Sequence, residues 1–197
     1  MQVILASASP RRHELLKQLV DDFLIVPTNI DEDALTTEDP FETAESLAWK
    51  KAEAVPVGYV NPIIVGCDTV VALQDLEGYW TQFTKPISAD DAIRILKELR
   101  GKTHQVITGV AVITPVKSSV AHCVTNVTFH DASDQEIEDY VKTGEPMDKA
   151  GAYGAQGMGS FLVKELDGPF DNVIGLPLDL TRKLLEISGY DHFKLNS

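Results

Sequence analysis

The sequence predicts an α/β domain with a mixed sheet and flanking helices. In the first half of the chain, short apolar runs typical of strands alternate with segments of helical periodicity, as in parallel βαβ units. In the second half, two β-branched runs at residues 103–115 and 119–131 are separated by a short turn around Pro115, which indicates an antiparallel hairpin. The 197 residues are 44% hydrophobic, and we expect a single domain over residues 1–197, or one domain with two lobes around a central cleft.

The first two elements are a strand at residues 3–6 and a helix at residues 10–20. Ser9 is a favourable N-cap, and Pro10 suits the first helical position. Arg11 and Arg12 therefore fall in the first turn, where the positive end of the helix dipole makes a basic side chain unfavourable by up to about 1 kcal/mol. Helix N-termini bind anions through free backbone N–H groups, so a bound anion would offset this cost.

The remaining elements follow from periodicity and turn residues. Residues 23–33 begin as a strand and end in an acidic turn, and residues 40–54 have helical spacing. Residues 63–73 form a continuous apolar run, typical of a strand covered on both faces. Cap and stop residues predict helices at 88–102 and 133–144; a glycine-rich stretch at 144–159, a strand at 160–168 and a final helix at 177–188 follow.

Charge and cysteine content exclude several classes of protein. The chain has 30 acidic and 17 basic residues, a formal charge of −13, which argues against a general nucleic-acid or anionic-membrane surface. An anionic ligand would therefore be small and bound locally. The sequence has neither a signal peptide nor a stretch near the roughly 18 apolar residues of a membrane helix, so we expect a cytoplasmic protein. Cys67 and Cys123 lack a C-x-x-C partner, which predicts buried, reduced thiols.

Asp68 is the first candidate for chemistry, because it lies in the apolar run IIVGCDTVVAL. A lone carboxylate in a buried strand costs several kcal/mol unless it is paired, protonated or bound to a metal ion. One interpretation is a structural role, in which Asp68 caps a neighbouring loop. The other is a metal ligand or general base, with Thr69 beside it.

Further charged groups are candidates, each with a structural alternative. Residues 31–33 (Asp-Glu-Asp) follow a strand, where open α/β sheets place ligand-facing residues, although a solvated loop explains any one of them better. Lys50 and Lys51 close the helix at 40–54, where positive charge also stabilises the helix. Lys85 precedes a proline and has the alternative of an ordinary surface lysine.

The segment GEPMDKAGAYGAQGMG, residues 144–159, contains five glycines. Glycine at this density is typical of tight turns or of backbone that approaches a ligand closely. The segment matches neither the Walker A sequence nor G-x-G-x-x-G, so it carries no nucleotide-binding signature of its own.

Together, eight segments in order resemble the Maf family of nucleoside triphosphate pyrophosphatases. They span nearly the whole chain: ASASPRR (6–12), NIDED (29–33), SLAWKKA (46–52), GCDTVV (66–71), TKP (84–86), HQVITGVAV (104–112), GEPMDKAGAYGAQG (144–157) and NVIGLPL (172–178). The resemblance implies a fold related to that of the inosine triphosphate pyrophosphatases. It also implies hydrolysis between the α- and β-phosphates of a nucleotide.

The resemblance further implies a divalent cation, Mg²⁺ or Mn²⁺, and assigns roles to individual residues. Asp68 is the implied catalytic carboxylate and metal ligand, with Glu32 as a second metal ligand. The implied substrate-binding residues are Ser7, Arg11, Arg12, Lys51, Thr69, Lys85 and Gln156.

Three of these positions track base preference within the family. The combination Arg11, Thr69 and Gln156 is similar to the subgroup that acts on dTTP and UTP, whereas the 7-methyl-GTP subgroup more usually has Trp at the first position and Glu at the third. One position departs from the family pattern: Thr84 stands before the Lys-Pro pair where Gly is usual, which puts the backbone freedom beside Lys85 in doubt.

Two other functions stay open. A pyrophosphatase for deaminated or otherwise modified purine nucleotides would use the same phosphate site with a different base pocket. A nucleotide-binding regulator of septum formation is the alternative that is not an enzyme. In each case we expect a nucleotide as the ligand, with no nucleic-acid polymer or membrane as partner, and a homodimer is left open.

Overall fold

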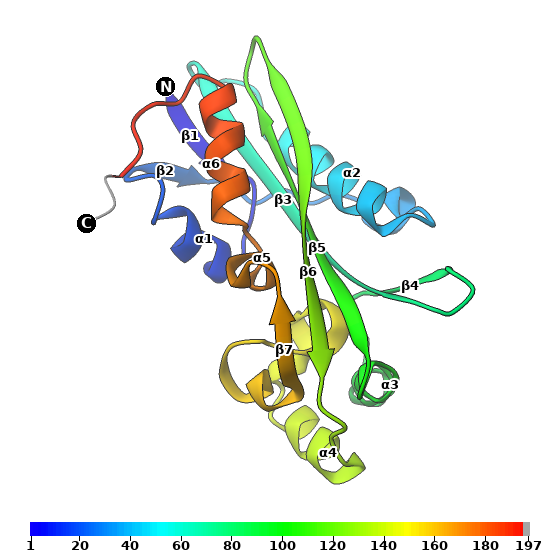
Figure 1. Cartoon of the computed structure of the whole chain (residues 1–197). Helices are drawn as coiled ribbons and strands as arrows, with labels where there is room; N and C mark the ends of the chain where they lie inside the picture. The colour runs from blue at the N-terminus through cyan, green and yellow to red at the C-terminus, as the bar shows by residue number, and fades with distance from the viewer. Residues whose placement is uncertain (195–197) are drawn as a thin grey trace. The chain divides into compact units, whose positions relative to one another are not determined.

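A seven-stranded mixed sheet flanked by helices forms the framework of the protein in the computed structural model, which describes residues 1–194 (Figure 1). The strands are β1 (Gln2–Leu5), β2 (Phe23–Ile25), β3 (Pro62–Gln74), β4 (Trp80–Phe83), β5 (Thr103–Ile113), β6 (Ser118–Phe129) and β7 (Val163–Asp167). Their order in the sheet is β2-β1-β3-β5-β6-β7, with β4 paired to β3. The predicted fold class is therefore confirmed.

The helices are α1 (Pro10–Leu16), α2 (Pro40–Glu53), α3 (Ala89–Leu99), α4 (Asp134–Lys142), α5 (Phe170–Ile174) and α6 (Leu178–Ile187). Four short 3₁₀ segments complete the described chain: η1 (Asp33–Leu35), η2 (Glu145–Asp148), η3 (Ala150–Ala152) and η4 (Gly157–Leu162). Three of these four lie in or next to the glycine-rich segment, which therefore consists of tight turns.

The chain forms two compact units. Among the described residues, unit 1 contains residues 1–68, 108–123 and 175–194, and unit 2 contains residues 69–107 and 124–174. The long strands β3, β5 and β6 each contribute residues to both units. The central cleft expected between two lobes stays a prediction.

Unit 1 is organised around the parallel strands β1, β2 and β3. Val3 pairs with Phe23 on one side and with Ile63 on the other. Helix α2 lies close against this sheet, because β3 and β5 each present a glycine to it. A Cβ atom at Gly66 would lie 2.7 Å from the backbone nitrogen of Ala52, and one at Gly109 would lie 2.8 Å from that of Glu45. Any larger side chain would therefore push α2 off the sheet.

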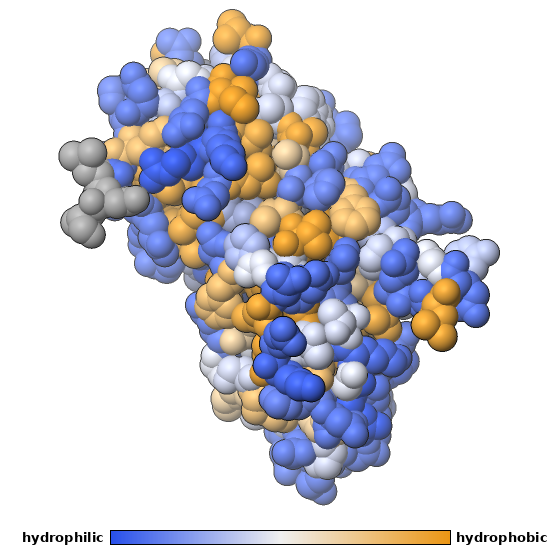
Figure 2. All heavy atoms as spheres, viewed as in Figure 1, coloured by the Kyte–Doolittle hydropathy of each residue, from blue (hydrophilic) through white to orange (hydrophobic). Residues whose placement is uncertain are grey.

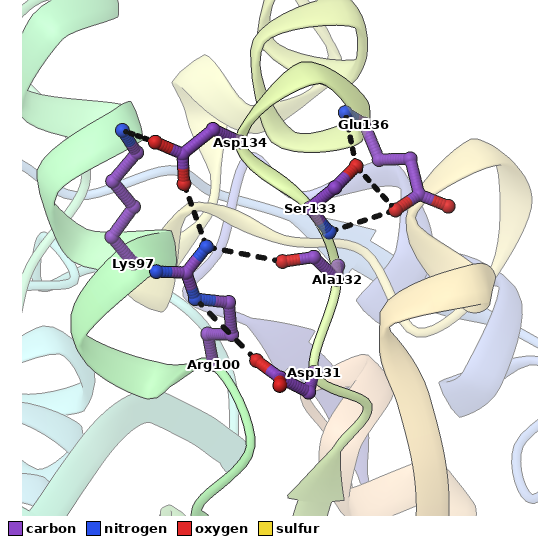
Figure 3. A network of polar contacts seen from close by, with 7 residues as sticks. All are labelled: Lys97, Arg100, Asp131, Ala132, Ser133, Asp134 and Glu136. Atoms are coloured by element: carbon purple, nitrogen blue, oxygen red, sulfur yellow. Dashed lines mark hydrogen bonds and ion pairs between the residues drawn. The ribbon is translucent and has the colours of Figure 1, made fainter.

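Unit 2 has a hydrophobic core to which strands β3 to β7 and helices α3 and α4 contribute. Strands β3 and β4 pair antiparallel, as do β6 and β7. Polar contacts join the exposed ends of α3 and α4 (Figure 3): Arg100 donates to Asp134 at 2.7 Å, and Lys97 donates to the same carboxylate at 2.8 Å. Ser133 and Glu136 form a capping box at the start of α4.

The hydropathy of the surface and of the helices agrees with the charged composition of the chain. Figure 2 shows hydrophilic side chains over much of the face it draws, with smaller hydrophobic areas between them. Among the helices formed by residues 1–194, none is both long and apolar enough to span a bilayer.

Several local predictions were wrong at the level of single elements. Helix α1 ends at Leu16, four residues early, because Gln18 and Leu19 donate to the carbonyls three residues before them and tighten the chain into turns. Leu19 and Val20 nevertheless stay buried, as their apolar pattern predicts. Strand β4 and helix α5 were not predicted, since four and five residues are too few to show a period.

Two residues also differ from their predicted state. Ser9 occupies the N-cap position of α1, but its side chain makes no capping hydrogen bond. Neither Cys67 nor Cys123 forms a disulfide, as expected, but only Cys67 is fully buried and Cys123 is partly exposed. The hairpin at Pro115 is confirmed, because Thr114 N–H donates to the Lys117 carbonyl at 2.8 Å between the neighbouring strands β5 and β6.

Candidate functional site

The carboxylates of Asp68 and Glu32 bind the same ammonium group in unit 1. Lys51 Nζ forms an ion pair with Asp68 Oδ1 and another, at 2.7 Å, with Glu32 Oε1. The Lys51 and Asp68 side chains are each only 12% exposed, whereas that of Glu32 is 50% exposed. The cluster is therefore buried at Lys51 and Asp68 and open to solvent at Glu32.

Asp68 reaches this cluster from inside β3, two residues after Gly66. Lys51 comes from the last turn of α2, one residue before Ala52, whose backbone lies against Gly66. The close approach of α2 to β3 at Gly66 thus sets the distance between lysine and carboxylate. Asp68 lies inside β3 and pairs with Lys51, and its role as metal ligand or general base stays a prediction.

Several effects act on the charge of Lys51. Burial lowers the pKa of its ammonium, whereas the charge of Asp68 and the hydrogen bonds to Asp68 and Glu32 raise it; repulsion from Arg12 lowers it. The net pKa lies above the usual value for lysine. Lys51 is therefore a permanent cation at neutral pH, and Arg12 lies close enough to add a second positive charge to the same region.

Ser7 organises the start of α1, where the two arginines lie. Its hydroxyl accepts a hydrogen bond from Ser9 N–H at 3.2 Å and one from Arg12 Nη1 at 3.4 Å, and its carbonyl oxygen lies 2.8 Å from His13 Nε2. Arg12 Nε also donates to the carbonyl of Gly175 at 2.9 Å. These contacts fix the direction of the Arg12 guanidinium and tie the segment NVIGLPL to the helix start.

The sequence did not indicate the partners of Arg12. The Gly175 carbonyl lies 163 positions away in the chain, and a backbone oxygen leaves no trace in residue type. Gly175 itself has a φ of +119°, a conformation that favours glycine, so the glycine in NVIGLPL marks a strained turn but not its contact with Arg12.

The other predicted residues divide between the two units. Arg11 lies in unit 1, in the first turn of α1, with a partly exposed side chain. Thr69, Lys85 and Gln156 all belong to unit 2, where Thr69 is partly buried and both Lys85 and Gln156 are exposed. The structure thus brings together Ser7, Arg12, Glu32, Lys51 and Asp68, and their arrangement toward Thr69, Lys85 and Gln156 stays a prediction.

Thr84 does not need the freedom of the glycine that the family pattern usually has there. Among the non-glycine residues of the described chain, only Asn61 and Ala152 have positive φ. The Thr84 carbonyl accepts a hydrogen bond from Gly151 N–H at 3.3 Å, which joins the segment before Lys85 to the glycine-rich segment. The departure from the pattern therefore leaves the backbone at Lys85 in an ordinary conformation.

The donor set at Lys51 fits one kind of metal site. Within residues 1–194, no group of three or more His, Cys, Asp or Glu side chains is arranged to hold a metal ion. Mg²⁺, however, is commonly bound by one or two carboxylates together with substrate phosphates. Asp68 and Glu32 supply two carboxylates at one point, so the residues fit a cation that arrives with a phosphate ligand.

The described site combines a basic helix start with a carboxylate–lysine cluster in a mixed α/β sheet. The family model for Maf-like proteins matches residues 2–187, and the chain belongs to this family. A relative from Symbiobacterium thermophilum is 43% identical over 192 residues, 98% of this chain and 96% of its own, and one from Dictyoglomus turgidum is 46% identical over 193 residues, 96% and 97% of the two chains. A relative from a Geobacillus species is 42% identical over 189 residues, 96% and 99% of the two chains. Each of the three is named dTTP/UTP pyrophosphatase.

Proposed function

We propose that the chain is a nucleoside triphosphate pyrophosphatase that hydrolyses dTTP and UTP to the monophosphate and pyrophosphate. The observation that carries the proposal is the cluster in which Lys51 joins Asp68 and Glu32, within electrostatic reach of Arg12. The cluster combines what phosphoanhydride hydrolysis requires, namely cations for the phosphates and a carboxylate for water. The name shared by full-length relatives supports the same activity.

The residues of the cluster divide the chemical work. Arg12 and Lys51 bind phosphate oxygens, and Ser7 and the Gly175 carbonyl hold the Arg12 guanidinium in place. Asp68 accepts a proton from a water molecule as the water oxygen bonds to the α-phosphorus. The bond from the α-phosphorus to the bridging oxygen breaks, and pyrophosphate leaves with the electron pair while the cations neutralise its charge.

A divalent cation, Mg²⁺ or Mn²⁺, is part of the proposal, and Asp68 and Glu32 would hold it. Such a cation neutralises phosphate charge and makes bound water more acidic. Lys51 forms ion pairs with both of these carboxylates. Lys51 is therefore placed to exchange carboxylate for phosphate oxygens when substrate and cation bind.

Within this proposal, Arg11, Thr69 and Gln156 determine which base is preferred. Lys85 is a further contact to the phosphates. Gln156 is exposed at the N-cap position of η4 and offers both a donor and an acceptor, which suits the edge of a uracil or thymine base. The proposal includes a cytoplasmic location, where free nucleotides are available as substrates. A homodimer is compatible with it, and sedimentation velocity distinguishes dimer from monomer.

The test is a screen for released pyrophosphate over all common and several modified nucleoside triphosphates, with Mg²⁺ and separately with Mn²⁺. We expect dTTP and UTP to react fastest and pyrophosphate, not orthophosphate, to appear first. Orthophosphate as the first product excludes cleavage between the α- and β-phosphates. Preference for modified purines supports the alternative enzyme, and nucleotide binding without turnover supports a regulator.

A further inference from the structure

The glycine-rich segment of unit 2 is folded around a carboxylate. Glu145 Oε1 accepts hydrogen bonds from Tyr140 O–H at 3.0 Å and from Gly159 N–H at 3.1 Å, and Glu145 Oε2 accepts one from Met158 N–H at 3.1 Å. Tyr140 in turn accepts a hydrogen bond from Gly154 N–H at 3.1 Å. Backbone groups on both sides of Gln156 are thereby tied to Glu145, directly or through Tyr140.

The glycines of this segment leave space for Glu145 and Tyr140. A Cβ atom at Gly154 would lie 3.0 Å from Glu145 Oε1, one at Gly157 would lie 3.1 Å from Oε2, and one at Gly159 would lie 2.5 Å from the Tyr140 hydroxyl oxygen. The glycines are therefore needed for packing inside the protein, because they let the backbone close around side chains. From the sequence alone, they could equally have made room for a ligand.

Glu145 is suited to this role as an anion. Burial raises the pKa of its carboxyl, but the hydrogen bonds from Met158, Gly159 and Tyr140 lower it, and the net pKa lies below the usual value for glutamate. Charge-assisted hydrogen bonds of this kind are stronger than neutral ones. The loop at residues 154–159 is thus held by an ionised acceptor with three donors.

We propose that Glu145 is a positioning residue for base recognition, which acts by fixing the backbone on either side of Gln156. This inference rests on the proposed function, because a nucleotide substrate is what gives Gln156 a base to select. Gln156 is itself exposed, so its own side-chain environment does little to hold it. Its orientation depends on the backbone that Glu145 and Tyr140 hold, and loss of that support should affect discrimination between bases before it affects phosphate binding.

The test compares wild type with Glu145→Gln, Tyr140→Phe and the control Glu165→Gln, which removes the same charge from an exposed position on β7 of the same unit. For each variant, kcat and KM are measured for UTP and CTP, which differ at position 4 of the base, and pyrophosphate alone is used as an inhibitor. Amide hydrogen exchange at residues 154–159 reports on the loop without reference to activity.

In Glu145→Gln, an amide NH₂ replaces one acceptor oxygen, so at least one of the three donors loses its partner. We expect the UTP-to-CTP ratio of kcat/KM to fall about 10-fold, mainly through KM for UTP, and loop amides to exchange faster. The inhibition constant for pyrophosphate should stay within about twofold. Tyr140→Phe removes one donor to the carboxylate and the acceptor of Gly154 N–H, so it should lower the ratio in the same direction, and Glu165→Gln should behave as wild type.

Each outcome decides a different question. A wild type that hydrolyses no nucleotide overturns the proposed function, and the role of Glu145 in base recognition falls with it. An active and selective wild type whose selectivity survives in folded Glu145→Gln overturns the positioning role alone. Parallel weakening of UTP and pyrophosphate, or a lower kcat with unchanged KM and selectivity, would mean that Glu145 has a general structural role, and would also overturn the inference.

Discussion

Asp68 is a buried carboxylate with a defined partner, and its replacement separates catalysis from folding. Asp68→Asn keeps an oxygen that can accept from Lys51 but removes the charge and the proton acceptor. We expect turnover to fall roughly 10²-fold or more. The free energy of unfolding should fall by about 1–2 kcal/mol, because Lys51 keeps only a neutral partner at this position. Steady-state kinetics and urea unfolding measure the two effects.

The control is Asp22→Asn, which changes an exposed aspartate of unit 1 outside the cluster. It should leave both quantities nearly unchanged. Near wild-type turnover of Asp68→Asn at saturating Mg²⁺ or Mn²⁺ would show that Asp68 is structural, and the proton acceptor would then have to be sought elsewhere.

Arg12 combines a binding role with a structural one. Arg12→Ala removes its hydrogen bonds to the Gly175 carbonyl and to Ser7, so we expect the free protein to lose about 1 kcal/mol of stability. Binding of pyrophosphate should weaken by something like 1.5–3 kcal/mol, the range of a charge-assisted hydrogen bond. Thermal melts without ligand and inhibition by pyrophosphate measure the two losses. An unchanged inhibition constant would transfer the phosphate role to Arg11.

At the scale of elements, the contact between α2 and β3 determines whether the cluster exists. Gly66→Ala would place a methyl group within 2.7 Å of the Ala52 nitrogen and against the Ala48 carbonyl, both of them backbone atoms that cannot rotate away. We expect a loss of about 3 kcal/mol or more in stability, as for overpacked cores, and lower activity in the protein that stays folded, because Lys51 moves with α2. Differential scanning calorimetry and kinetics below the melting temperature test this.

A second substitution tests whether the added methyl group at position 66 clashes with the backbone of α2 or with the side chain of Ala52. Ala52→Gly removes the methyl group that lies 2.9 Å from the added Cβ, yet it leaves both backbone contacts in place. The double variant Gly66→Ala/Ala52→Gly should therefore gain no stability over the single one. Recovery in the double variant would contradict the close backbone packing.

The same contact shows what the sequence could and could not predict. Arg11, Arg12 and Asp68 were local signals, because a cap followed by a proline locates a helix start and a charge stands out in an apolar strand. The Lys51–Asp68 ion pair was not a local signal, since it depends on how closely α2 lies against Gly66. Short elements such as β4 carry too few residues for a periodic pattern, and their pairing with a longer strand decides their structure.

The glycine-rich segment is the clearest case of a pattern with an undetermined meaning. Its composition indicated tight turns, which η2, η3 and η4 confirm, but it did not reveal that Glu145 accepts the hydrogen bonds of the segment. Glycine content indicates that space is needed beside the backbone. It does not indicate whether a ligand or a side chain fills that space.

At the scale of the whole molecule, a buried histidine makes stability depend on pH. His104 is 1% exposed in unit 2, its Nε2 lies 2.9 Å from the Tyr153 hydroxyl oxygen, and its ring packs edge-on against Phe129 and Tyr153. Burial lowers the pKa of His104 from 6.5 to about 3. The folded protein therefore keeps His104 neutral in a range where the unfolded chain binds a proton. Its contribution to stability is complete above pH 6.5 and is lost progressively as the pH falls toward 3.

The size of this effect follows from the two pKa values. At pH 5, which is about 1.5 units below the pKa of histidine in the unfolded chain, protonation of this residue stabilises the unfolded state by roughly 2 kcal/mol. We expect His104→Gln, which keeps a polar side chain beside Tyr153, to be less stable than wild type at pH 7.5 but to lose about 2 kcal/mol less between pH 7.5 and pH 5. Urea unfolding at both pH values gives this difference, and His130→Gln, an exposed site in the same unit, should follow wild type. Because the carboxylates titrate alike in all three proteins, equal pH dependence in His104→Gln and wild type would mean that His104 accepts a proton in the folded state.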